Sequence, residues 1–253
     1  MRDINFLDEI IRITDFIKEQ LQQAHHENCL IGLSGGIDSA LTAALCVKAV
    51  GREKVRGVMM PYKSSQKESL DHALEMAKLL GIKYEIIDIT PMVDTYFDLY
   101  QPEANHLRRG NRMARERMCI LYDLSARYRA LVAGTSNRSE LMVGYCTQYG
   151  DSACAFEPIA HLYKTEVRKM AEILAIPQAI IDKNPTADLW DNQTDEDELG
   201  ISYRKLDNIL YSLYEQCLPV NEIEKQGFKN KDIMKVIKLV ENSEFKRKMP
   251  PTL

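Results

Sequence analysis

One stretch of the sequence decides the fold: CLIGLSGGIDSA, residues 29–40. The apolar residues 29–33 predict a short buried strand, which runs directly into Ser34-Gly35-Gly36-Ile37-Asp38-Ser39. Residues 40–50 are apolar and end at Gly51, which predicts a helix with a glycine stop. Adjacent glycines let the backbone turn tightly and direct N–H groups at an anion, and the following helix adds its positive end. The stretch therefore predicts a strand, an anion-binding loop and a helix.

The polar residues of this loop indicate which anion it suits. Ser34 and Ser39 can donate hydrogen bonds to phosphate oxygens, and no lysine follows the glycines, so the loop is not of the GxxxxGK[ST] type. Small donors with one carboxylate suit a pyrophosphate leaving group, with Asp38 holding Mg²⁺ against it. The alternative is an ordinary strand-to-helix turn in which Ser and Asp act as caps.

Working outward from the loop, strands and helices alternate. Strands are predicted at 55–60, 84–89, 130–135 and 156–160, and helices at 67–80 and 105–129, among others. This order predicts an α/β fold: a doubly wound, parallel, five-stranded sheet with helices on both faces. Residues 183–200 are expected to form a loop. A helical C-terminal extension is predicted from about residue 200, and residues 1–253 are interpreted as a single domain.

Composition and charge exclude several classes of protein. The chain has 33 Lys+Arg and 37 Asp+Glu, a net charge of −4, and 45% hydrophobic residues, values typical of globular proteins and unfavourable for general nucleic-acid binding. It has no apolar run of about 18 residues, and its first residues, MRDINFLDEI, lack the apolar core of a signal peptide. Six cysteines form no CxxC pair, and Cys29, Cys46 and Cys119 lie in apolar stretches, which predicts buried free thiols. We expect a cytoplasmic protein without nucleic-acid or membrane partners.

The string SGGIDS resembles the pyrophosphate loop of the ATP pyrophosphatases, which adenylate a carbonyl oxygen and release pyrophosphate. From Leu33 to Lys248 the chain resembles the ammonia-dependent NAD synthetases within that group. The resemblance rests on eight blocks in the right order: GLSGGIDSA (32–40), GNRMARERM (110–118), GTSNRSE (134–140), YGD (149–151), KT (164–165), PTADLW (185–190), DEDELG (195–200) and FKRKMP (245–250).

This resemblance implies a C–N ligase. The carboxylate of nicotinic acid adenine dinucleotide (deamido-NAD) attacks the α-phosphate of ATP, pyrophosphate leaves, and ammonia displaces AMP from the acyl-adenylate to give NAD. It also implies Mg²⁺ as cofactor, ATP as co-substrate, and a homodimer with the substrate site at its interface. A chain of 253 residues has no room for a glutamine amidase domain, so free or partner-delivered ammonia is the implied nitrogen donor.

The resemblance assigns the ATP side of the site. Asp38 and Glu140 are the expected metal ligands, and Lys164 is expected to contact the phosphates and stabilise charge on pyrophosphate. The expected ATP-binding residues are Gly32, Leu33, Ser34, Gly35, Gly36, Ile37, Asp38, Ser39, Arg117, Thr135, Lys164 and Thr186.

For the dinucleotide, the expected contacts are Asn111, Arg115, Gln148, Asp151 and Lys246. We hypothesise that Asp151 binds ammonium and accepts its proton, which makes Asp151 catalytic beside Lys164. The acidic run 195–198 is interpreted as a solvated loop, although its match to the family suggests a loop that orders over the site.

The sequence departs from the family pattern at Gln148, Ala155 and Phe245, which are substrate-contacting positions in the family, and at Ser136. Two alternatives remain. Another adenylating enzyme, such as a tRNA-thiolating one, commonly needs paired cysteines, which this chain lacks. A nucleotide-sensing module without turnover is expected to lack a metal ligand, whereas Asp38 and Glu140 are both present.

Overall fold

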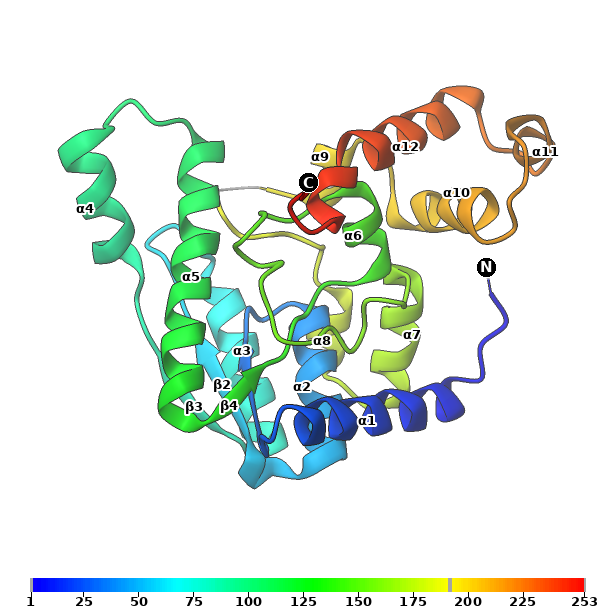
Figure 1. Cartoon of the computed structure of the whole chain (residues 1–253). Coiled ribbons are helices and arrows are strands. Elements are labelled where there is room, and N and C mark those ends of the chain that lie inside the picture. Colours follow the sequence, from blue (N-terminus) through cyan, green and yellow to red (C-terminus); the bar gives the residue numbers. More distant parts are fainter. Residues whose placement is uncertain (1, 191–192, 253) are drawn as a thin grey trace.

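The computed structural model describes residues 2–190 and 193–252 (Figure 1). Its centre is a parallel sheet in the strand order β3–β2–β1–β4. The strands are β1 (Asn28–Gly32), β2 (Val55–Met59), β3 (Lys83–Ile86) and β4 (Ala130–Val132). The chain adds strands on one side of β1 and then returns to its other side. The carboxyl end of β1 therefore lies at the point where the strand order reverses, which is where open α/β sheets bind ligands.

Twelve α-helices and two short 3₁₀ turns surround the sheet within the described residues. The helices are α1 (Phe6–Gln23), α2 (Ile37–Val50), α3 (Lys67–Leu80), α4 (Thr90–Tyr100), α5 (His106–Tyr128), α6 (Arg138–Val143), α7 (Lys164–Ile173), α8 (Gln178–Asp182), α9 (Asp195–Leu199), α10 (Tyr203–Tyr214), α11 (Val220–Lys225) and α12 (Asn230–Asn242). The turns are η1 (Arg52–Lys54) and η2 (Glu244–Arg247). As the sequence predicts, glycines end two of the helices, Gly51 after α2 and Gly81 after α3.

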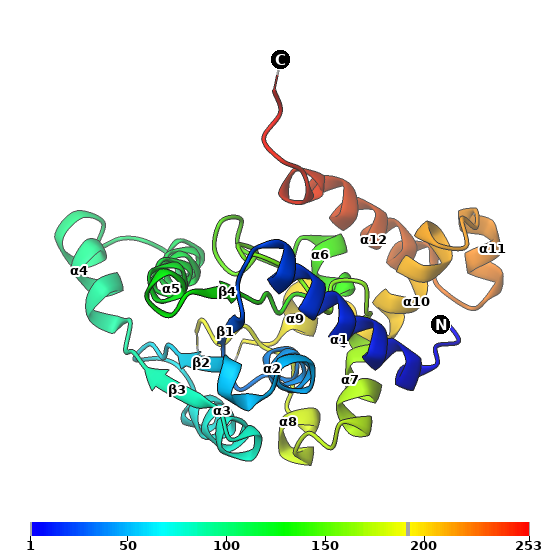
Figure 2. The same cartoon turned by 60° about the horizontal axis from the view of Figure 1, so that its bottom comes forward.

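Helices cover both faces of the sheet, because successive strand side chains point to opposite faces. Cys29 and Ile31 of β1 are buried against α1, α2 and α3, whereas Leu30 is buried against α4 and α5. Figure 2 shows α2 and α3 on one side of the strands and α4 and α5 on the other. The predicted fold with helices on both faces is confirmed.

The C-terminal helices build their own apolar core. Leu206, Ile209, Ile233 and Val236, from α10 and α12, are fully buried, and they pack with Val143 of α6. In Figure 1 these helices lie beside α6, away from the sheet. The predicted helical extension is confirmed. This extension packs against α6, which follows the turn after β4, and residues of that turn contribute to the site.

The structure corrects four sequence expectations. The described sheet has four strands rather than five, because Phe156 makes a single bridge to Ala133 and Pro158 cannot donate to a ladder. The expected loop 183–200 contains helix α9, and α8 and α11 add two helices that the sequence reading did not separate. Cys119 is exposed rather than buried, although Cys29 and Cys46 are buried as predicted, and all six thiols are free. None of the helices described here is long and apolar enough to cross a membrane.

Candidate active site

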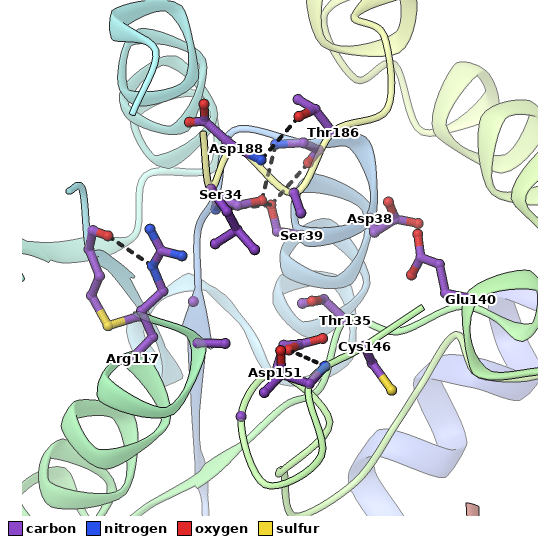
Figure 3. A pocket seen from close by; sticks show the side chains of 18 of the residues that line it. Ser34, Asp38, Ser39, Arg117, Thr135, Glu140, Cys146, Asp151, Thr186 and Asp188 are labelled. Carbon is purple, nitrogen blue, oxygen red and sulfur yellow. Dashed lines mark hydrogen bonds between the residues drawn. The ribbon is translucent and has the colours of Figure 1, made fainter. Parts of the chain in front are cut away.

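A cavity of about 560 Å³ opens at the carboxyl end of the sheet (Figure 3). Its wall comes from the segments after β1, β2 and β4, from α5, and from residues 183–190. Its volume lies in the range of pockets that hold small molecules and cofactors. Most of the predicted ATP-binding residues line it: Gly32, Leu33, Ser34, Gly36, Ile37, Asp38, Ser39, Arg117, Thr135, Lys164 and Thr186.

The loop between β1 and α2 is preformed by its own hydrogen bonds. Ser39 Oγ donates to the Gly36 carbonyl at 3.0 Å, and Gly36 N–H donates to Ser34 Oγ at 3.2 Å. Gly35 has φ +77°, and a Cβ there would lie 1.9 Å from the Ser69 carbonyl oxygen in the first turn of α3. Both facts require glycine at this position. Helix α2 begins at Ile37 without a side-chain cap, so its first N–H groups remain available for an anion at the cavity wall.

Beside this loop, Lys164 lies between the two predicted metal ligands, Asp38 at the end of the loop and Glu140 of α6. Its Nζ donates to Asp38 Oδ2 and, at 2.9 Å, to Glu140 Oε1, and the lysine side chain is only 3% exposed. Figure 3 shows the Asp38 and Glu140 carboxylates pointing toward one another. Asn137 orients both acids: its Nδ2 donates to Asp38 Oδ1 at 2.9 Å, and it caps α6 in a box with Glu140.

The electrostatics of this cluster are dominated by burial. Burial raises the pKa of Glu140 to about 8, against the pull of Lys164. Burial alone lowers the pKa of Lys164, but Asp38 and Glu140 more than offset it, so the net pKa is raised. Two carboxylates that converge on one cationic nitrogen offer the hard oxygen ligands that Mg²⁺ prefers. The residues present therefore fit the metal that the family implies.

Asp195 joins this cluster, and the sequence reading misplaced it. Its side chain is 4% exposed and lines the cavity, with Tyr203 Oη donating to Asp195 Oδ2 at 3.0 Å. Its Oδ1 is buried without a hydrogen-bond partner among the described residues. The prediction of a solvated run is wrong for Asp195, whereas 196–198 are exposed. The signal was helical spacing, because Asp195 lies one turn before the buried Leu199 on α9.

The predicted dinucleotide residues divide into two groups. Asn111, Asp151 and Lys246 line the cavity, whereas Arg115 and Gln148 do not, although Arg115 donates to the Gln148 carbonyl oxygen at 3.3 Å.

The three lining residues meet at the segment 144–151. Thr147 donates from its hydroxyl to Asn111 at 2.8 Å and from its N–H to Asp151 at 2.9 Å. Lys246 donates to the carbonyl oxygens of Gly144 and Cys146, each at 2.7 Å. Solvent reaches Asp151 from the cavity, yet the protein atoms around it raise the pKa of its carboxyl by desolvation.

Two more cations line the cavity and form no ion pair among the residues that the structure describes. Arg117 Nε donates to the Met60 carbonyl oxygen at 3.0 Å, and burial lowers the pKa of Arg117. Lys183, which the sequence reading did not single out, donates to Ser69 Oγ at 2.6 Å. A lysine before an Asn-Pro dipeptide has no distinctive sequence signal, because only the fold brings it to the cavity.

Residues 186–188 lie over the pyrophosphate loop, on the same side of the cavity as Ser34 and Ser39 (Figure 3). Asp188 holds φ +52°, and its N–H donates to Thr186 Oγ1 at 3.0 Å. Its carboxylate accepts from the Gln66 N–H at the start of α3. Such non-glycine strain is typical of segments that the surrounding structure holds for binding.

Three comparisons with known proteins agree with this geometry. Residues 9–250 match the family described as NAD synthase. The chain is 44% identical, over 99% of its length and 92% of the relative's, to the NH(3)-dependent NAD(+) synthetase of Trichlorobacter lovleyi. Among solved structures it resembles the NMN synthetase of Francisella tularensis, with a TM-score of 0.89, 30% identity and 99% coverage of both chains. It also resembles the NH3-dependent NAD synthetase of Campylobacter jejuni, with a TM-score of 0.85, 34% identity and coverage of 99% and 100%.

Proposed function

This chain belongs to the NAD synthase family, and we propose that it amidates nicotinic acid adenine dinucleotide with ammonia in an ATP-dependent reaction that yields NAD, AMP and pyrophosphate. One observation carries the proposal furthest. A preformed loop of small donors, Ser34 to Ser39, lines the same cavity as the carboxylates of Asp38, at the end of that loop, and Glu140 of α6. This arrangement suits the polyphosphate of ATP, and the family membership supplies the acceptor.

The first half-reaction activates the substrate carboxylate. A carboxylate oxygen attacks the α-phosphorus of ATP, the bond from that phosphorus to the bridging oxygen breaks, and its electron pair leaves with pyrophosphate. The backbone N–H groups of the loop and of the first turn of α2 stabilise the negative charge that develops on pyrophosphate. Asp38 and Glu140 would hold Mg²⁺, which supplies positive charge to the phosphate oxygens. Lys164 keeps the two acids in place and adds its own charge.

The second half-reaction adds nitrogen. Ammonium loses a proton, and the resulting ammonia attacks the acyl carbon. AMP leaves with the electron pair of the acyl–oxygen bond, and the nitrogen loses a second proton. We propose Asp151 as the group that accepts the ammonium proton, since its carboxyl faces the cavity and desolvation raises its pKa toward that task. Asn111 and Lys246 lie on the same wall and are proposed to hold the dinucleotide.

We further propose that the chain works as a single domain in the cytoplasm, as a homodimer whose interface completes the substrate site. Leu107 supports the dimer, because it lines the cavity and is 62% exposed, and Leu99 and Tyr100 at the end of α4 are exposed as well. Light scattering after gel filtration tests the mass, and a Leu107→Glu variant should become monomeric and lose affinity for the dinucleotide. A monomeric wild-type protein with full activity would contradict this part.

The structural likeness to an NMN synthetase favours a second candidate, amidation of nicotinic acid mononucleotide to NMN. It uses the same chemistry on a smaller substrate. The test incubates the protein with ATP, Mg²⁺, ammonium and either acid, and separates the nucleotides by chromatography. We expect NAD, AMP and pyrophosphate in equal amounts, with a kcat/KM for the dinucleotide at least about tenfold higher, since the second nucleotide adds contacts. A preference for the mononucleotide would select the second candidate, and pyrophosphate release without either amide would point to another adenylating enzyme.

A further inference from the structure

Lys183 is an unexplained cation at the pyrophosphate loop. It follows α8, is half-buried, and lines the same cavity as Ser34, Gly36 and Ser39. Its Nζ donates to the hydroxyl of Ser69 at 2.6 Å, and it forms no ion pair with any residue for which the structure gives a placement. Burial lowers the pKa of Lys183, although Asp188 and Glu68 act in the opposite direction. Its positive charge is thus partly desolvated, and no carboxylate of the described residues lies within ion-pair distance of its ammonium.

Ser69 connects this lysine to the loop. Its carbonyl oxygen occupies the space where a Cβ of Gly35 would be, so the loop backbone and the first turn of α3 are in direct contact. The lysine that holds the Ser69 hydroxyl is therefore next to the loop rather than across the cavity. Asp188 anchors the same segment to α3 a second time, through the Gln66 N–H at 3.1 Å. Two contacts to one helix fix the segment 183–188 beside the loop.

Charge accounting separates Lys183 from Lys164. The Lys164 ammonium is bound by two carboxylates, with Asp195 nearby, so that cluster carries a net negative charge while all three acids are ionised. Such a cluster attracts a metal ion, and its carboxylates already offset part of the charge that Lys164 offers to an anion. Lys183 donates only to a neutral hydroxyl, which a phosphate oxygen can replace with a stronger, charge-assisted hydrogen bond.

We propose that the Lys183 ammonium binds the terminal phosphates of ATP and remains with pyrophosphate as it leaves. This inference rests on the proposed function for its reaction step. As the bond between the α-phosphorus and the bridging oxygen breaks, the electron pair moves onto pyrophosphate. The Lys183 N–H groups turn from Ser69 to that leaving group, and no proton or electron needs to be transferred. Lys183 then touches the reacting ligand directly, as a catalytic residue of the first half-reaction.

The test is a calorimetric titration of the full chain with pyrophosphate and Mg²⁺, for the wild type and three variants. Lys183→Gln should raise the Kd for pyrophosphate about 10- to 100-fold, the cost of one hydrogen bond to a charged group. Lys183→Arg should keep it within about threefold, since the charge is retained. Lys78→Gln, an exposed lysine at the far end of α3, is the matched control and should change nothing. In steady-state assays Lys183→Gln should also raise the KM for ATP and leave the KM for the dinucleotide within about twofold.

The outcomes separate this proposal from the proposed function. If Lys183→Gln binds pyrophosphate as tightly as the wild type, or if the wild type does not bind pyrophosphate at millimolar concentration, the proposal about Lys183 is wrong. An equal rise in the KM values for ATP and for the dinucleotide in Lys183→Gln would mean a structural role and would also overturn it. Because the titration contains no nicotinate substrate, a selective loss of pyrophosphate affinity supports the Lys183 site even if the product assay yields no NAD.

Discussion

Lys164 and Lys183 line the same cavity but differ in their surroundings: carboxylates surround the first, and a neutral hydroxyl contacts the second. Lys164 is 3% exposed and held by Asp38 and Glu140, whereas Lys183 is half-buried and donates to a serine hydroxyl. Arg117 and Lys246 resemble Lys183, because each donates to an uncharged oxygen rather than to a carboxylate; for these two the acceptors are backbone carbonyl oxygens. We call the region of Asp38, Glu140, Asp195 and Lys164 the acidic cluster, and the residues Arg117, Lys183 and Lys246 the unpaired cations.

The difference shows how one cavity can serve two kinds of charge. With all three acids ionised the acidic cluster carries more negative than positive charge, which favours a divalent cation, and removing its lysine would leave buried carboxylates without their cation. The unpaired cations form no ion pair among the described residues, although Asp151 and Asp188 act on them from a longer distance, so an anionic ligand can form close, charge-assisted hydrogen bonds with them. ATP complexed with Mg²⁺ matches both regions at once. Each prediction below perturbs one region and leaves the other intact.

The largest effect is expected from Asp38→Asn in the acidic cluster. Turnover should fall by about 10³-fold or more, because the variant loses a proposed Mg²⁺ ligand and with it several kcal/mol of transition-state stabilisation. The product assay measures the loss, and circular dichroism checks that the fold is intact. Asp71→Asn, an exposed acid on α3, is the matched control. Turnover retained in Asp38→Asn would refute the assignment of this residue to the metal.

The same substitution at the two lysines should have opposite consequences for stability. Lys164→Met leaves two buried carboxylates without their cation and should cost about 3–5 kcal/mol of unfolding free energy. Lys183→Met removes a desolvated charge that has no acidic partner, so its effect should lie within about 1 kcal/mol. Urea denaturation without Mg²⁺ measures both variants. Equal losses of unfolding free energy in the two variants would contradict the distinction between the acidic cluster and the unpaired cations.

Arg115 does not line the cavity, so its substitution tests whether a residue behind the wall affects binding of the dinucleotide. It donates to the Gln148 carbonyl oxygen beside the segment that carries Asp151. Arg115→Ala should raise the KM for the dinucleotide about five- to tenfold and leave the KM for ATP within about twofold. Arg127→Ala, an exposed arginine near the end of the same helix, serves as the control. Equal effects on both substrates would mean that this part of α5 does not discriminate between them.

Glu157 belongs to neither region, so its substitution should change stability and its pH dependence. Burial raises its pKa to about 7 from an ordinary 4.5, and its carboxylate accepts from the Ser136 N–H at 3.1 Å. The folded protein keeps a proton that the unfolded chain releases, so this group makes stability fall as the pH rises from about 4.5 to 7.

Glu157→Gln removes that pH dependence while retaining an oxygen that accepts from Ser136. The variant should be more stable than the wild type by about 3 kcal/mol at pH 8, and the two should converge below about pH 4.5. Denaturation curves across this pH range measure the difference. A constant difference at every pH would contradict a titrating Glu157.

Local sequence was sufficient for the central strands, the main helices and the tight turn after β1. The alternation of apolar strands and helices predicts the doubly wound order, and the glycines at 35 and 36 predict a tight, anion-binding turn. The error at 156–160 has a local cause, since an apolar run that contains Pro158 supports one bridge and no ladder.

The site is harder to predict from the sequence, because tertiary contacts bring together residues that are far apart in the chain. Lys164 and Asp38 are 126 residues apart, and only the packing of α7 against α2 brings them together. Lys164 was found through its resemblance to a known block, because a lone lysine before a helix has no signal of its own. Lys183 and Asp195 lie in the segment that the sequence predicts to be a loop. The burial of Lys183 depends on its contact with α3, and that of Asp195 on its contact with Tyr203.

The central claim is that the substrate carboxylate attacks the α-phosphorus of ATP inside this cavity. The most direct measurement supplies nicotinic acid adenine dinucleotide whose carboxylate carries a heavy oxygen isotope, together with ATP, Mg²⁺ and ammonium, and analyses the products by mass spectrometry. The account predicts one labelled oxygen in AMP, none in pyrophosphate, and NAD that keeps the other. Label in inorganic phosphate or pyrophosphate, or unlabelled AMP beside newly formed NAD, would contradict it.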